Sequence, residues 1–244
     1  MHSMSLDPAL ATTRAAPAAD VSPRLLGALF ITEAVLAFAP VAVLGPAIGW
    51  PASLRQPAAT QLTAIAAQPD ALALGYGLYL LYSILIAPVM IGLAARALGG
   101  LGRPIAATVA AFAALSALAR SIGILRWLTV MPALAQSHAG AANAAARAQI
   151  ELAFSAISSY GGGIGELLGV SIFMAFSLGL LCAHALRTGA LPRWLAALGL
   201  VTSLGLASVA TPSFGLALTM PIAVGGTLLS VWMLAAGIWL LRSR

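Results

Sequence analysis

Four ionisable residues, Glu33, Arg120, Arg126 and Glu166, lie inside long apolar stretches of the sequence. A charge at the centre of a bilayer costs about 2.5–3.5 kcal/mol on insertion scales, so such residues usually face the protein interior and find partners. Two acids and two bases form a neutral set, which predicts pairing. An arginine without such a partner would suit a carboxylate, a phosphate or a lipid head group.

The position of each charge along its apolar stretch predicts its depth. Arg120 lies about fifteen residues into its stretch, or roughly 22 Å at ~1.5 Å per helical residue. Arg126 should reach the opposite interface, where the neighbouring Trp127 would also suit an ordinary interfacial anchor. Glu166, on an antiparallel stretch, falls between the two arginines in depth. We therefore expect Glu166 to pair with Arg120 or with Arg126.

Glu33 fits this scheme less well. It lies about 12 Å deep by the same rise per residue, which is too shallow for Arg120 unless the first apolar stretch tilts or unwinds. Pro40 and Pro46 provide places at which it could unwind.

Tyrosines and glycines gather at the depth of these charges. Tyr76, Tyr79 and Tyr82 are spaced to cover one arc of a helix, although tyrosine at a membrane interface is often only a belt residue. Glu166 lies beside a GxxxGxxxG ridge, which allows another helix to approach closely. The candidate ligand-binding residues are Arg120, Arg126, Glu166, Glu33, Tyr76 and Tyr79.

The sequence offers little for catalysis, metals or nucleic acids. The only cysteine is Cys182, and His184 has no second histidine within an apolar stretch, so we expect no metal, haem or other cofactor. No nucleotide loop, zinc-protease or serine-hydrolase motif is present. No basic patch with interleaved aromatic residues is present either, so we expect no nucleic-acid partner and name no catalytic residue.

The composition places these residues in a membrane protein. The chain has 244 residues, of which 61% are hydrophobic and 7% charged, whereas soluble domains carry about 25% charged residues. Six apolar stretches approach the ~20 residues that a spanning helix needs. We expect an all-α bundle of about six transmembrane helices over 23–244, after a disordered cytoplasmic tail at 1–22. The expected spans are 25–48, 71–97, 105–135, 162–186, 194–210 and 216–241.

The connections differ in length and in charge. The loops at 49–70 and 136–160 are long, and the second has helical spacing, with a bend expected at the glycines 161–163. The two long loops lie on one side of the membrane and contain two arginines. The tail, the two short turns and the C-terminus lie on the opposite side and contain eight. Because positive loops stay inside, both termini should be cytoplasmic.

Three motifs carry a resemblance to a known family. They are ARSIGILRWLTVMPALA at 119–135, YGGGIGELLG at 160–169 and GALPRWLAALGL at 189–200. In these the chain resembles the bacterial domain-of-unknown-function family 4386. The resemblance implies a membrane protein of about six helices in the bacterial cytoplasmic (inner) membrane, and it supplies no catalytic residues.

Three functional classes remain open. The first is a protein that binds or transports a small anionic or amphipathic ligand, or a lipid head group, in a polar cavity of the outer half. The alternative is a structural or regulatory membrane subunit, in a homo- or hetero-oligomer, that uses small-residue ridges such as Gly226 with Ser230. An intramembrane enzyme with Glu166 as acid or base is the least favoured, because no nucleophile or metal completes the site.

Overall fold

The computed structural model describes residues 22–218 and 220–243, and all regular elements within these ranges are helical. Six helical segments are long and apolar enough to cross a membrane, which confirms the predicted helix bundle. Apart from Ser22, the expected tail lies outside the described residues. The segments are Pro23–Ile48, Pro69–Ala97, Pro104–Ala139, Ala144–Thr188, Arg193–Phe214 and Ile222–Arg242.

The first segment is interrupted. Two residues, 37 and 38, separate helix α1 (Pro23–Leu36) from helix α2 (Ala39–Ile48). Pro40 explains the break, because it has no N–H with which to continue the hydrogen-bond ladder of α1. The segment therefore unwinds near one of the two prolines at which the sequence allowed it.

Helices α4 (Pro69–Ala97) and α5 (Pro104–Leu128) form an antiparallel hairpin, and α6 (Val130–Ala139) continues α5 after a discontinuity at Thr129. Between the first segment and α4 lie a 3-10 turn, η2 (Ala52–Arg55), and a short helix, α3 (Ala58–Ala67), in the long loop for which no structure was predicted.

The fourth segment corrects one expectation. Helix α7 (Ala144–Gly162) continues through a π-helical stretch, η3 (Gly163–Phe173), into α8 (Met174–Thr188). The expected helix in the 136–160 loop is present, but the bend at the three glycines is not. Together these elements form one helical segment of 45 residues, or roughly 68 Å at ~1.5 Å per residue. It is more than twice as long as a ~30 Å hydrocarbon core is thick.

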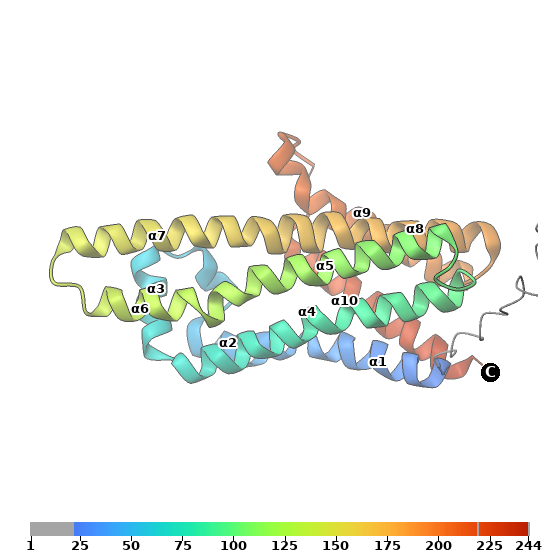
Figure 1. The fold of residues 1–244 in the computed structure, drawn as a ribbon, viewed down its shortest axis with the longest axis horizontal. Helices are drawn as coiled ribbons and strands as arrows, with labels where there is room; N and C mark the ends of the chain where they lie inside the picture. Colours follow the sequence, from blue (N-terminus) through green and yellow to red (C-terminus); the bar gives the residue numbers. More distant parts are fainter. Residues whose placement is uncertain (1–21, 219, 244) are drawn as a thin grey trace, which may run out of the picture.

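The last two segments are α9 (Arg193–Ala210), extended by the 3-10 turn η4 (Thr211–Phe214), and α10 (Ile222–Arg242). Helix α10 begins six residues after the predicted start at 216, because Pro221 stands at its N-cap and breaks the apolar run. In Figure 1 the connection between α9 and α10 stands out to one side of the bundle.

The bundle has two distinct ends. The start of α1, the α4–α5 turn, the α8–α9 turn and the end of α10 lie together, and we call this the terminal end (Figure 1). At the opposite end, α6 and α7 project beyond α2 and α4 as a helical hairpin, with α3 beside them. We call this the hairpin end. His138 on α6 contacts Glu151 on α7 at 2.9 Å and joins the two arms of the hairpin.

The apolar interior forms two clusters. The larger joins α1, α4, α5, α8, α9 and α10, with Trp232 and Met174 fully buried in it. The smaller lies at the hairpin end and joins α2, α3, α4, α5, α6 and α7 around Trp127 and Phe154. Five of the six candidate residues lie between these two clusters, where α4, α5 and η3 meet.

Candidate functional site

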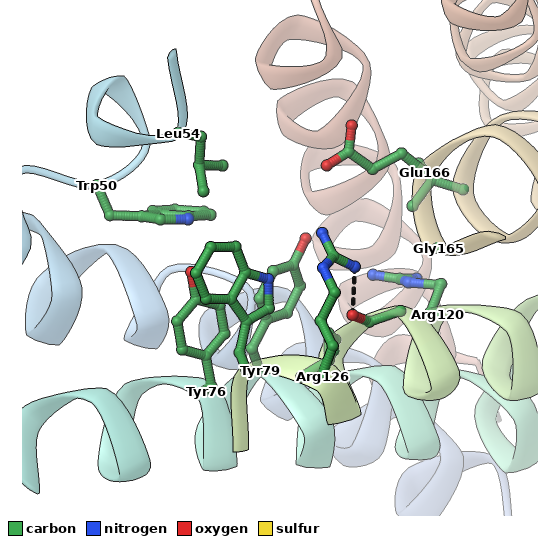
Figure 2. Close-up of a pocket in the computed structure, with 12 residues that line it drawn as sticks. Trp50, Leu54, Tyr76, Tyr79, Arg120, Arg126, Gly165 and Glu166 are labelled. Carbon is green, nitrogen blue, oxygen red and sulfur yellow. Dashed lines mark hydrogen bonds between the residues drawn. The ribbon is translucent and has the colours of Figure 1, made fainter. Parts of the chain in front are cut away.

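A cavity of about 50 Å³ lies where α4, α5 and η3 meet below the 3-10 turn η2. Figure 2 shows Trp50 and Leu54 above it, Tyr76 and Tyr79 on one side, and the two arginines opposite. A water molecule needs about 10–15 Å³ of such space, so the cavity has room for a few waters or one small polar group. Its walls are Trp50, Leu54, Tyr76, Tyr79, Arg120, Gly123, Ile124, Arg126, Trp127, Gly165, Glu166 and Val170.

Glycines allow the two helices that carry the charges to approach closely. The Cα of Gly123 is so near η3 that a methyl group there would lie 2.7 Å from the Cα of Gly165. At Gly169 an added methyl would lie 2.7 Å from the Cγ of Arg120, and at Gly161 it would lie 2.6 Å from the Cδ of Arg126. The predicted glycine ridge therefore packs against α5 of the same chain, and both arginine side chains lie along it.

Arg120 is 4% exposed, and its guanidinium carbon lies 4.4 Å from the centre of the Tyr82 ring. This cation–π contact covers one face of the guanidinium. Its Nε and Nη1 atoms have no hydrogen-bond partner among the described residues. Arg120 therefore lines the cavity with two buried N–H donors that have no acceptor among these residues.

Arg126 is half-buried and held from two sides. Its Nη1 donates a hydrogen bond to the backbone oxygen of Gly123, drawn as the dashed line in Figure 2. Its guanidinium carbon lies 5.3 Å from the centre of the Trp127 ring. Its Nε has no partner within the described part of the chain. Arg126 thus lines the cavity and also contacts Trp127, its expected neighbour in an interfacial anchor.

Glu166 does not form the expected ion pair. Within residues 22–218 and 220–243, the structure places no carboxylate oxygen within 4.0 Å of an arginine nitrogen; the one ion-pair contact joins His138 and Glu151. The Glu166 side chain is exposed at the edge of the cavity, and Arg126 attracts it from a greater distance. The predicted pairing of Glu166 with Arg120 or Arg126 as a direct salt bridge was wrong.

The reason lies in the local winding of the helix. Glu166 sits in the π-helical stretch, where hydrogen bonds run from residue i to i+5 instead of i+4. The Ser171 hydroxyl donates to the Glu166 backbone oxygen, five residues back, at 2.9 Å. The depth estimate assumed a regular α-helix and gave no direction for the side chain, so it did not show whether the Glu166 carboxylate reaches an arginine. Such stretches occur frequently at functional sites.

The aromatic side of the cavity is firmly packed. The Tyr76 and Trp127 rings stack with centroids 4.8 Å apart and planes 1° from parallel. Trp50 packs edge-on against Tyr79 at 6.0 Å, and Phe154 packs edge-on against Trp127 at 6.2 Å. These contacts hold Trp50, Tyr76, Tyr79 and Trp127 in the cavity wall and link that wall, through Phe154, to the apolar cluster of the hairpin end.

Five of the six candidate residues line the cavity, namely Arg120, Arg126, Glu166, Tyr76 and Tyr79. Glu33 does not; it is fully buried on α1. The sequence did not single out Trp50 or Leu54, because neither lies in a helix whose face could be predicted. The sequence analysis included Tyr82 only in the tyrosine arc. Its spacing of three residues from Tyr79 places it on the same face of α4, which was the available indication that it could reach Arg120.

A family model described as "Domain of unknown function (DUF4386)" matches residues 25–237. The chain belongs to this family. The match confirms the resemblance carried by the three motifs, and it covers every element that lines the cavity. No curated protein and no solved structure matches the chain. The function of this DUF4386 protein therefore has to be argued from the cavity itself.

Proposed function

We propose that this DUF4386 protein binds a small anionic ligand, or the anionic head of an amphipathic one, in the cavity beside Arg120. The observation that carries the proposal is the pair of unpartnered N–H donors of Arg120. A buried donor without an acceptor costs about 1–3 kcal/mol, and more when it is charged. An anion that reaches one of these donors would reduce this cost, because it can accept a charge-assisted hydrogen bond there.

The balance of charge at the cavity also favours an anion. Arg120 and Arg126 face it with Glu166 as the single acid among its walls. The cavity therefore carries one positive charge in excess, beside apolar walls that include Trp50, Leu54 and Ile124. Electrostatic attraction is several times stronger in such surroundings than in bulk water.

The size and the other walls of the cavity limit the ligand. About 50 Å³ accommodates a carboxylate, a sulfonate or a phosphate group but not a large hydrophilic molecule. Trp50, Leu54 and Ile124 offer an apolar surface for any attached hydrocarbon. A free small anion and a lipid head group share this chemistry, and a binding experiment distinguishes them.

The experiment is direct binding to the purified protein in a neutral detergent. Methanesulfonate and inorganic phosphate represent free anions, and nanodiscs with or without phosphatidylglycerol represent the lipid source. We expect at least one probe to bind the wild type, and Arg120→Leu to lose more than about tenfold in affinity, since a charged hydrogen bond contributes about 1.5–3 kcal/mol. Arg147→Leu is the matched control. Arg147 is exposed on α7 and does not line the cavity, so this variant should bind like the wild type.

Two results would overturn the proposal. One is that none of the probes binds the folded wild-type protein. The other is that Arg120→Leu, correctly inserted and monodisperse, binds the same probe as tightly as the wild type does.

A further inference from the structure

Glu33 is a fully buried acid that does not line the cavity. Its side chain is 0% exposed, and both carboxylate oxygens lack a hydrogen-bond partner among the described residues. An ionised carboxylate without partners is strongly disfavoured in an apolar interior, whereas the neutral acid is tolerated far better. The surroundings of Glu33 therefore decide what it can do.

The register of the helices places Glu33 level with the middle of α4. A methyl group on Gly92 would lie 2.9 Å from the Leu26 side chain, and one on Gly75 would lie 2.4 Å from that of Leu44. Glu33 lies between Leu26 and Leu44 on the first segment, so it meets α4 about halfway between those two contacts.

Arg120 also meets this part of α4, where its guanidinium lies over the Tyr82 ring. It is the charged group that acts on Glu33, and Glu33 acts on it in return. Of the helices packed against α1, α2 has no titratable side chain, and α10 has only Arg242 at its far end. Tyr82 is the titratable residue of α4 nearest to this level. Glu33 and Arg120 therefore both lie against the middle of α4, and Arg120 also lines the cavity.

We infer, on the basis of the proposed anion site, that Glu33 controls the charge available to the ligand: its neutral form leaves Arg120 free for an anion, and its ionised form competes for Arg120. With Glu33 neutral, Arg120, Arg126 and Glu166 sum to one positive charge, which matches one monoanion. With Glu33 ionised the set is already neutral, and a bound anion would add an uncompensated negative charge to an apolar interior.

The proton balance follows from this competition. When an anion enters while Glu33 is ionised, one proton from the solvent binds a Glu33 carboxylate oxygen, and Arg120 keeps its own proton. When the anion leaves, Glu33 can release that proton again. Anion affinity is therefore constant below the pH at which Glu33 ionises, and above it falls by up to about tenfold per pH unit.

The test uses methanesulfonate, which stays a monoanion throughout the pH range. Its affinity for the full-length protein is measured from mildly acidic to alkaline pH, for the wild type, Glu33→Gln and Glu166→Gln. We expect the wild type to lose affinity at the alkaline end, Glu33→Gln to stay tight across the range, and Glu166→Gln to change in affinity but keep the wild-type slope. Identical slopes in the wild type and Glu33→Gln would overturn the inference.

Calorimetry of the same binding keeps the test decisive if Glu33→Gln does not fold. In two buffers with different ionisation enthalpies, wild-type binding at alkaline pH should take up close to one proton, and Glu166→Gln should take up the same number. Binding without proton uptake contradicts the role of Glu33 but leaves the anion site intact. Absence of binding at every pH contradicts the proposed function itself.

Discussion

Gly123 and Gly165 bring the backbones of α5 and η3 into contact: a methyl group on Gly165 would lie 3.2 Å from the Cα of Gly123, and the reverse distance is 2.7 Å. Both glycines line the cavity, together with Arg120 and Arg126, which lie on either side of Gly123 along α5. The same approach is reinforced by the Ser116 hydroxyl, which donates to the Gly169 backbone oxygen at 2.8 Å.

The first prediction concerns this contact. Gly123→Ala should destabilise the protein by about 1–3 kcal/mol, because the added methyl meets backbone atoms that cannot move aside cheaply. Thermal unfolding in detergent measures the loss. Gly163→Ala is the control, since an added methyl there meets nothing within 4 Å, and it should leave the melting temperature unchanged or slightly raised. Equal melting temperatures for the two variants would contradict the close contact.

The second prediction concerns the hairpin end. Trp127 is 4% exposed and packs between the Tyr76 and Phe154 rings. Trp127→Ala should cost about 3–5 kcal/mol, as truncation of a large buried aromatic residue does. Trp194 is 57% exposed, so Trp194→Ala should cost far less in the same unfolding assay. If the two substitutions were equally costly, Trp127 would not hold the hairpin-end cluster together.

The third prediction compares the two arginines. Arg126 already donates to the Gly123 oxygen and is less buried than Arg120, so it has less to gain from an anion. We expect Arg126→Leu to weaken methanesulfonate binding by about threefold to tenfold, less than Arg120→Leu does. Titration of both variants at one pH checks the order. A larger loss in Arg126→Leu would move the centre of the site to Arg126.

The fourth prediction concerns orientation. The arginine asymmetry predicts that the terminal end faces the cytoplasm and the hairpin end the outside. Ala142 and Thr188 are exposed at opposite ends, while the native Cys182 is buried. Ala142→Cys should react with a membrane-impermeant maleimide on intact cells, whereas Thr188→Cys should react only after permeabilisation. The opposite pattern would reverse the topology.

Hydropathy alone predicted the six spans, because lipid-facing helices must be apolar over a fixed length. Their ends were harder to predict where proline intervened, as at Pro221 before α10. The continuous helix through Gly161–Gly163 was not predicted either, because glycine is tolerated in transmembrane helices when a neighbour packs against it. Here α5 is that neighbour, and only the three-dimensional packing reveals it.

The sequence predicted most of the residues of the candidate site, but it did not predict the contacts between them. Depth along the helix was enough to bring Arg120, Arg126 and Glu166 to one region. Depth did not predict the direction in which each side chain points. The π-helical winding around Glu166 and the break after Leu36 both depart from the regular helix on which such a prediction depends. Arg120 consequently lies over Tyr82, where the spacing of the acids had suggested Glu166.

The most direct test of the anion site is diffraction from crystals soaked in bromide, a monoanion whose anomalous scattering locates it without ambiguity. The arrangement of Arg120 predicts a bromide peak in the cavity, within hydrogen-bond contact of its Nε or Nη1, and the loss of that peak in Arg120→Leu crystals. Bromide bound only at surface arginines, with water alone in the cavity at the same soak concentration, would contradict the central claim.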